Sequence, residues 1–130
     1  MFLIKEPLSG GVVRRPHPPE IVDIGVVCDD GAAVISIAGE LDVSNSGWLY
    51  ECLHDAIDAG ISQIVVDVGD LTFMDSTGLA VIVGAYKRMK ANGDTLTVRS
   101  PPPFVVRLFH VFDDVPHLMI QAKAGSRSRP

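Results

Sequence analysis

The chain has 130 residues, 47% of them hydrophobic, which is enough for one compact core and too few for two ordinary domains. Its net charge of −5 argues against a nucleic-acid-binding protein, because a phosphate backbone requires a basic surface and the 11 Lys and Arg residues are scattered. The two cysteines, Cys28 and Cys52, lie in apolar stretches and predict buried, reduced thiols rather than a disulfide or a metal cluster.

The two ends of the chain differ in composition from the middle. Residues 1–19 are rich in Gly, Pro and Arg and show little periodicity, which predicts a flexible leader. Residues 122–130 predict a disordered tail, so residues 20–121 are expected to form the folded domain. No segment approaches the ~20 apolar residues of a membrane span. We therefore expect a cytoplasmic protein that contacts no membrane and needs no metal or cofactor.

The folded domain opens with two β-branched runs. Residues 21–28 and 33–38 are separated by Asp29-Asp30-Gly31, which predicts a hairpin of antiparallel strands. The second run ends at 39–42, and Ser44-Asn45-Ser46 then offers N-caps for a helix whose apolar residues recur at helical spacing until a glycine closes it.

The rest of the domain alternates strand and helix patterns. Residues 63–68 are mostly apolar between turn residues, which is typical of a central strand covered on both faces. A helix is predicted from about Thr77, a strand over 95–98, a helix after the prolines at 101–103, and a last short strand over 117–120. This order predicts an α/β domain with a mostly parallel central sheet, an N-terminal antiparallel hairpin and crossover helices.

Polar residues follow strands at two points, 40–44 and 74–78, where helices are about to begin. Ligands and modifications gather at such places in open α/β sheets. A phosphate on Ser76 would face unpaired N–H groups at a helix N-terminus, and its charge beside Asp75 would repel a partner that accepts the neutral hydroxyl. The residues alone leave a structural reading open, in which Asp75 or Ser76 is an N-cap, Glu40 and Asp42 form a solvated turn, and Phe73 and Met74 belong to the core.

Residues 70–79, with the sequence DLTFMDSTGL, are followed by AVIVGAYK and strongly resemble the signature of STAS-domain anti-sigma factor antagonists. Residues 39–42 (GELD) resemble the second motif of that family, and Ser100-Pro101 with 106–109 resembles its third-helix region. The resemblance spans residues 20–120 in the right order. It implies a single STAS (SpoIIaa-like) domain.

The resemblance also implies a partner-switch cycle. Unmodified members bind an anti-sigma factor that is itself an ATP-dependent serine kinase, and a sigma factor is released. The kinase then phosphorylates the serine of the motif, here Ser76 and less favourably Thr77, and a PP2C-type phosphatase restores the binding form. The chain would thus be a substrate and not an enzyme, without direct nucleic-acid contact and with at most a weak dimer. The partner-binding residues implied are Glu40, Asp42, Ser44, Met74, Asp75, Thr77 and Gly78.

Three alternatives stay open at this stage. A phosphoaspartate receiver also places acidic residues at strand ends, but its acidic pair precedes a helix, whereas 29–31 here precedes another strand. A serine hydrolase would use Ser76 on a G-x-S-x-G turn, although Met74 occupies the position of the first glycine. Within the same fold, the chain could be a scaffold subunit of a stress-signalling complex or an accessory subunit of a membrane transporter.

Overall fold

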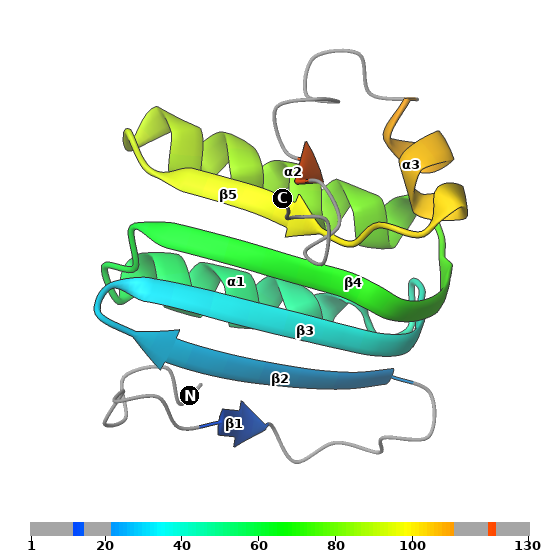
Figure 1. Ribbon diagram of the computed structural model, residues 1–130, viewed down its shortest axis with the longest axis horizontal. Helices are drawn as coiled ribbons and strands as arrows, with labels where there is room; N and C mark the ends of the chain where they lie inside the picture. The colour runs from blue at the N-terminus through cyan, green and yellow to red at the C-terminus, as the bar shows by residue number, and fades with distance from the viewer. Residues whose placement is uncertain (1–11, 15–21, 111–119, 122–130) are drawn as a thin grey trace, which may run out of the picture.

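The computed structural model of the protein describes residues 12–14, 22–110 and 120–121 (Figure 1). Six strands form one sheet in which each strand lies next to its neighbours in the sequence. The first three strands are antiparallel and the remaining pairs are parallel. The elements are β1 (Val12–Arg14), β2 (Val22–Asp29), β3 (Ala32–Leu41), α1 (Ser46–Asp58), β4 (Gln63–Met74), α2 (Ser76–Ala91), β5 (Thr95–Arg99), α3 (Pro103–Phe109) and β6 (Ile120–Gln121).

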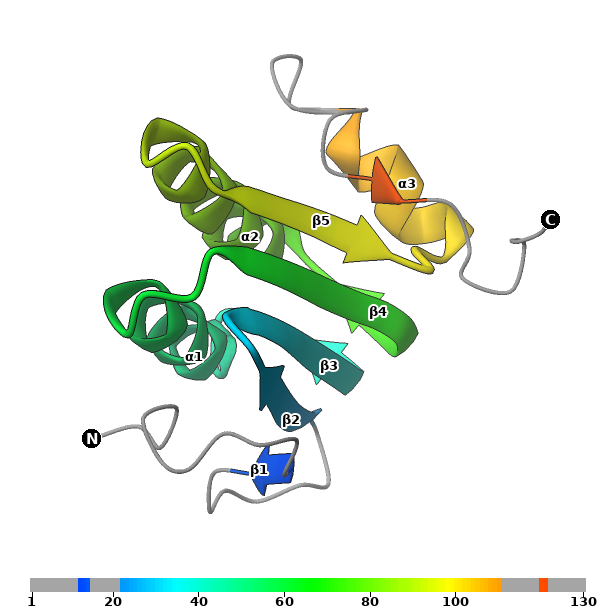
Figure 2. The same cartoon turned by 60° about the vertical axis from the view of Figure 1, so that its left-hand side comes forward.

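The helices are distributed unevenly around this sheet. α1 and α2 lie side by side on one face, and α3 lies beyond the C-terminal end of β5 (Figures 1 and 2). Within the described residues, no helix covers the other face. The mixed sheet with its N-terminal hairpin and crossover helices confirms the predicted α/β class.

The turn between β2 and β3 explains why the hairpin forms where the sequence predicted it. Asp30 and Gly31 have φ angles of 53° and 80°, the left-handed values that both central residues of a type I′ turn require. Asp29 pairs with Ala32 directly across the turn. The twist of such a turn matches that of the two strands, so the antiparallel pair is fixed locally.

The core lies between the sheet and the two long helices. The apolar positions of α1 that recur at helical spacing are fully buried there, and β4 contributes alternate residues from the sheet centre. Cys28 and Cys52 are both buried and form no disulfide with each other, as predicted, and burial raises the pKa of the Cys28 thiol. No helix in the described part of the chain has the length and apolar character that crossing a bilayer requires.

β4 is the element that differs most from prediction, because it continues to Met74 instead of ending near Val68. Its pairing with β3 shifts register twice between the pairs Ser36–Asp67 and Leu41–Met74. Over this stretch β4 advances by seven residues while β3 advances by five. Each extra residue in β4 is a β-bulge and reverses the direction in which the next side chains point. β4 therefore ends at Met74, only one residue before the start of α2.

Other boundaries differ by a few residues. Val12–Arg14 pairs with β2 although it falls in the segment predicted as a leader, and the remainder of the leader and the tail lie outside the described residues. The last strand overlaps the prediction at Ile120 alone, since residues 117–119 also lie outside the described ranges. α3 begins at Pro103, so the third of the three prolines takes the first helical position, where a missing N–H costs nothing.

Candidate functional site

The two polar segments predicted as a site meet at the C-terminal edge of the sheet. Leu41 at the end of β3 pairs with Met74 at the end of β4. The backbone N–H of Asp75 donates to the carbonyl oxygen of Leu41 at 3.2 Å, and the Asp75 carboxylate accepts from the backbone N–H of Val43. The β3–α1 junction (residues 41–46) and the β4–α2 junction (residues 74–76) therefore form one continuous surface.

Asp75 is the N-cap of α2. Its backbone is extended, and its carboxylate accepts from the N–H groups of Thr77 and Gly78 at 3.0 and 3.1 Å. The Thr77 hydroxyl donates to the same carboxylate oxygen. That hydroxyl, together with the backbone donors, holds the pKa of Asp75 below its ordinary value. Asp75 is thus ionised at neutral pH and held at the N-terminus of α2.

Ser76 is the first residue of α2 and its side chain is exposed. Among the described residues its hydroxyl has no hydrogen-bond partner, whereas the Thr77 hydroxyl is committed to Asp75. An exposed hydroxyl without a competing hydrogen-bond partner is accessible to a modifying enzyme. Ser76 therefore has the accessibility that a modification site needs.

One part of the predicted chemistry is wrong. The sequence suggested that a phosphate on Ser76 would be held by free N–H groups of the helix, but the N–H groups of Thr77 and Gly78 already donate to Asp75. A phosphoryl group on Ser76 would lie beside this ionised carboxylate and face solvent. The added charge would accordingly find the N–H groups of Thr77 and Gly78 already occupied.

Two of the predicted contact residues support the surface from beneath. Met74 is 3% exposed and Gly78 is also buried. A Cβ atom on Gly78 would lie 2.8 Å from Leu41 Cδ2, closer than real carbon atoms approach. Glycine at position 78 is therefore what allows the start of α2 to pack against the end of β3. Gly78 has no side chain, and the side chain of Met74 is buried beneath the surface.

The β3–α1 junction is organised by a residue that the sequence did not single out for this role. Asn45 is 5% exposed and, although it stands at the N-cap position, its side chain turns away from the helix. Its Oδ1 accepts from the N–H of Asp42 at 3.0 Å and its Nδ2 donates to the carbonyl of Glu40 at 2.9 Å. Asp42 in turn accepts from the N–H and the hydroxyl of Ser44 at 2.9 and 2.6 Å. Glu40 and Ser44 are exposed at the surface beside the second junction.

Exposed apolar side chains border this polar surface. Phe73 is 47% exposed, contrary to the prediction that it belongs to the core, because the second bulge in β4 turns it away from the face on which Met74 is buried. Val43, in the other junction, is 72% exposed. A contiguous exposed apolar patch with a polar rim is typical of protein interaction surfaces.

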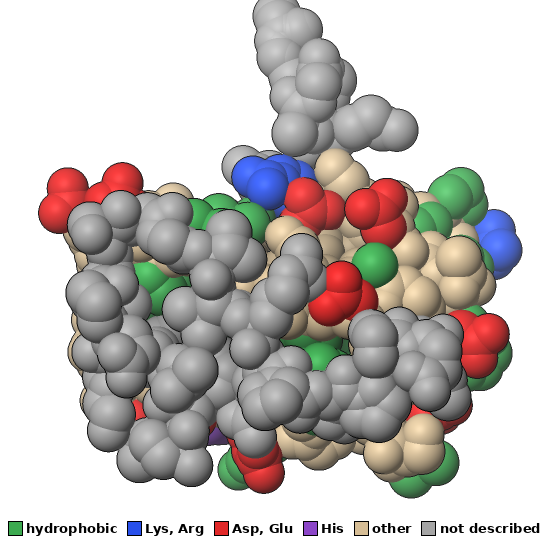
Figure 3. Space-filling model, turned by 90° about the horizontal axis from the view of Figure 1, so that it is seen from below, with side chains coloured by type: hydrophobic (Ala, Val, Ile, Leu, Met, Phe, Trp, Pro, Cys, Tyr) green, Lys and Arg blue, Asp and Glu red, His purple; other side chains and the backbone are tan. Residues whose placement is uncertain are grey.

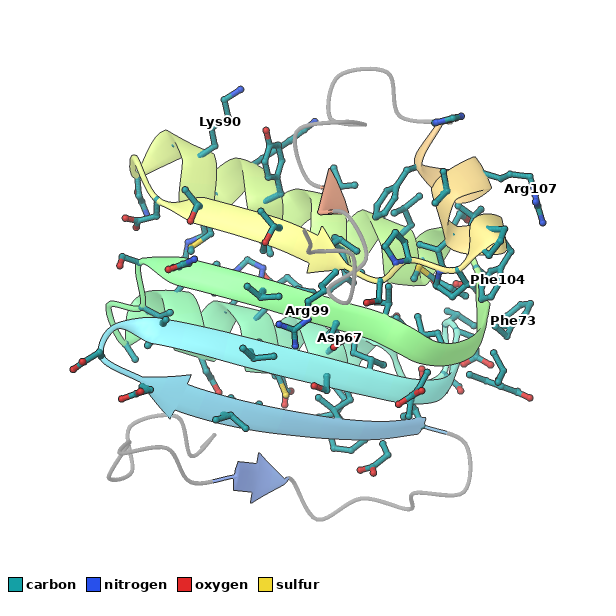
Figure 4. The ribbon with its side chains drawn as sticks, viewed as in Figure 1. Asp67, Phe73, Lys90, Arg99, Phe104 and Arg107 are labelled. Carbon is teal, nitrogen blue, oxygen red and sulfur yellow. The ribbon has the colours of Figure 1, made fainter. Side chains whose placement is uncertain are left out.

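A small hollow with three aspartates lies on the face of the sheet opposite the long helices. Asp23, Asp67 and Asp70 line this hollow, and Figure 3 shows acidic side chains gathered next to a basic one. Arg99 donates to the Asp67 carboxylate at 3.0 and 3.1 Å, and the pair lies across neighbouring strands (Figure 4). No group of three or more His, Cys, Asp or Glu side chains that could hold a metal ion occurs within residues 22–110 as described.

The described residues argue against both enzyme-like alternatives. Asp29 and Asp30 lie in a hairpin turn, so they are not the acidic pair of a receiver domain. A serine hydrolase needs a base next to its nucleophile. Within residues 22–110 the Ser76 hydroxyl has no hydrogen bond to a histidine or another base. His54 instead contacts Arg88 at 2.8 Å, and Arg88 lies twelve residues along α2 from Ser76, about 18 Å away.

Comparison with known proteins places this architecture in a family. The STAS domain model matches residues 23–118. The chain is 31% identical to the anti-sigma-B factor antagonist of Bacillus subtilis (strain 168) over 90 residues, which cover 69% of this chain and 82% of that protein. It is 35% identical to the anti-sigma F factor antagonist of Paenibacillus polymyxa over 79 residues, or 60% of this chain and 68% of that protein.

Solved structures agree with the family match. The anti-sigma factor antagonist SpoIIAA in its unphosphorylated form superimposes with a TM-score of 0.69 at 20% identity, over 78% of this chain and 89% of its own. The Bacillus cell fate determinant SpoIIAA in the phosphorylated form gives 0.66 at 19% identity, over 78% and 92%. Likeness at this identity shows a shared fold. The chain therefore belongs to the STAS domain family, where its curated relatives are anti-sigma factor antagonists.

Proposed function

We propose that this protein is an anti-sigma factor antagonist whose unphosphorylated form binds an anti-sigma factor with serine kinase activity and so releases a sigma factor. Family membership and the names of the curated relatives support the class of activity. The observation that carries the switch is the Ser76 hydroxyl, which is exposed and has no hydrogen-bond partner among the described residues. Such an activity takes place in the cytoplasm, where sigma factors act.

In this proposal the kinase phosphorylates Ser76 and a PP2C-type phosphatase removes the phosphate, so the chain is a substrate and has no catalytic residues. Thr77 is the poorer acceptor because its hydroxyl completes the cap formed by Asp75. A phosphate on Thr77 would force two anionic groups together and break the start of α2, whereas a phosphate on Ser76 leaves the cap in place. The fold thus tolerates modification at one hydroxyl better than at the other.

In this proposal the negative charge of the phosphate on Ser76 switches partner binding off. Phosphorylation adds about −1.5 to −2 charges next to the ionised Asp75. A docked partner that covers the neutral hydroxyl would have to bury this charge without a counter-ion, which costs about 3 kcal/mol or more. About 3 kcal/mol corresponds to roughly a hundredfold loss of affinity, enough to change a mostly bound protein into a mostly free one.

The contact surface in this proposal consists of side chains exposed at both junctions. Glu40, Ser44 and Thr77 are exposed there, and Asp42 and Asp75 are half-buried beside them. Because these side chains come from adjacent strand ends, a partner that reaches the β4–α2 junction also covers the β3–α1 junction. Partner affinity is therefore expected to depend on both.

Calorimetric titration with the purified anti-sigma kinase of the same organism tests the proposal. Ser76→Ala is expected to bind as tightly as the unmodified wild type, and Ser76→Asp to bind about a hundredfold more weakly with an unchanged circular dichroism spectrum. Ser62→Asp, the same change at an exposed serine just before β4, at the other end of that strand, is the matched control and should retain affinity. Equal affinity for Ser76→Asp and wild type would refute the charge mechanism.

A further inference from the structure

An apolar groove lies next to the proposed contact surface, between the end of β4 and α3. It has a volume of about 560 Å³ and is lined by Thr72, Phe73, Met74, Phe104, Arg107 and Leu108. Phe73 and Phe104 lie near each other on the side of the molecule where β4 ends, and Arg107 lies above them on α3 (Figure 4). The two aromatic rings come from segments about thirty residues apart, so the groove is a product of the fold.

α3 presents its partly buried residues toward this groove. Phe104 and Leu108 are four residues apart, which places them on one face of the helix, and both are half-buried. Val105 and Phe109, on another face, are fully buried in the core. α3 is thus anchored by one pair of side chains and leaves the other pair lining an open groove.

Arg107 gives the groove a positive rim on an otherwise acidic molecule. Its side chain is exposed, and within the described residues it has no acidic partner. Two other arginines within residues 22–110 are paired, Arg88 with Asp58 and Arg99 with Asp67. Arginine and aromatic residues, phenylalanine included, are both enriched at protein interfaces.

The groove also supplies what the surface around Ser76 lacks. A stable protein interface buries about 800 Å² on each partner and has an apolar centre surrounded by polar residues. The junction residues around Ser76 are polar and partly occupied by their own hydrogen bonds. Phe73 is three residues before Ser76 and continues the same surface toward α3.

On the basis of the function proposed above, we propose that this groove receives a segment of the anti-sigma kinase that carries one large apolar side chain and a neighbouring carboxylate. The apolar side chain inserts between Phe73 and Phe104, and the carboxylate pairs with Arg107. The segment docks whether or not Ser76 is modified, because the groove does not include the hydroxyl. Docking here holds the kinase on its substrate while the phosphoryl group is transferred.

Binding and phosphorylation by the purified anti-sigma kinase of the same organism test this assignment. Phe73→Ala and Arg107→Glu are each expected to weaken binding at least tenfold and to raise KM for Ser76 phosphorylation while kcat changes little. Lys90→Glu is the matched control: it makes the same charge change near the C-terminal end of α2, away from the groove (Figure 4), and should change affinity less than twofold. Thermal unfolding of each variant verifies that the fold is intact.

Methyl NMR gives a readout that does not depend on substitutions. With the kinase added, the methyl resonances of Met74 and Leu108 should shift, whereas that of Met89, buried near the C-terminal end of α2, should not. The groove assignment would be overturned if Phe73→Ala and Arg107→Glu bound the kinase with unchanged affinity and were phosphorylated like the wild type. It would also be overturned if the Leu108 methyl resonance did not shift. Either result would leave the proposed function standing. A wild type that neither binds the kinase nor accepts phosphate would refute the proposed function and the groove together.

Discussion

The two strand-to-helix junctions of this protein lie side by side and are built in different ways. The β3–α1 junction is a loop whose polar side chains bond to one another, with Asn45 holding the strand end and Asp42 holding Ser44. The β4–α2 junction has a single residue, Asp75, between strand and helix. One oxygen of its carboxylate accepts three hydrogen bonds from Thr77 and Gly78 of α2, and the Ser76 hydroxyl is left exposed.

This difference shows how one hydroxyl is singled out among several similar ones. Ser44 and Thr77 each donate to an aspartate two residues before them. Ser76 directly follows its aspartate, so its hydroxyl is outside the cap and has no partner among the described residues. Local hydrogen bonding, and not residue type, therefore separates the candidate acceptor from its neighbours.

Breaking the first junction should have the largest effect on stability. Asn45→Ala removes both hydrogen bonds of a buried side chain and leaves the partly buried Asp42 N–H and Glu40 carbonyl without these partners, which should lower the free energy of unfolding by about 3 kcal/mol. Asn92→Ala, at the exposed C-cap of α2, should cost less than about 0.5 kcal/mol. Urea unfolding of the two variants measures the contrast, and similar losses would mean that Asn45 does not organise the loop.

The packing between the junctions gives the next largest effect. Gly78→Ala would place a methyl group against Leu41 and should destabilise the protein by about 2 kcal/mol. Gly84→Ala is the control on the same helix, since nothing lies within 4 Å of its Cβ position, and should stabilise by about 1 kcal/mol. If both variants shift the urea midpoint in the same direction, the close approach of α2 and β3 is not present in solution.

The cap of the second junction should contribute less and should depend on pH. Asp75→Ala is expected to cost about 1 kcal/mol near pH 7. Because the folded-state pKa of Asp75 is lowered, its contribution is complete above the ordinary aspartate pKa of 3.8 and is lost as pH falls through the folded-state pKa. The difference in unfolding free energy between wild type and variant should thus shrink below about pH 4. A difference that is constant from neutral to strongly acidic pH would contradict the role of an ionised cap.

The hydroxyls themselves should have the smallest effects. Ser44→Ala removes the bond to Asp42 and should cost about 0.5 kcal/mol. Ser76→Ala removes an exposed group without a partner and should leave the free energy of unfolding unchanged within about 0.3 kcal/mol. Denaturant unfolding curves of the two variants, measured in parallel, give both free-energy changes. A larger loss of unfolding free energy for Ser76→Ala than for Ser44→Ala would mean that Ser76 has a structural role.

Much of the fold was predictable because its determinants are local. Asp29-Asp30-Gly31 specifies a turn, and apolar residues at helical spacing specify α1 and α2. The second half of β4 was missed because its two bulges replace the alternation of a strand with buried residues three apart, at Val68, Leu71 and Met74. Such a spacing does not resemble a strand until the partner strand is known.

The site was predictable in outline and not in detail. The positions of Ser76 and Asp75 followed from the order of strand and helix. The exposure of Phe73 depends on a bulge, and the role of Asn45 depends on the path of the loop, so neither could be read from local pattern. The sequence left open whether Asp75 or Ser76 caps α2, because only the cap geometry shows that the N–H groups of Thr77 and Gly78 donate to Asp75.

Mapping of the phosphate after incubation with the anti-sigma kinase and ATP tests the central claim most directly. Tandem mass spectrometry of the wild type should find one phosphate, on Ser76, and Ser76→Ala should accept none. A phosphate on Ser44 or Thr77, or an unmodified wild type in the presence of the active kinase, would contradict the account.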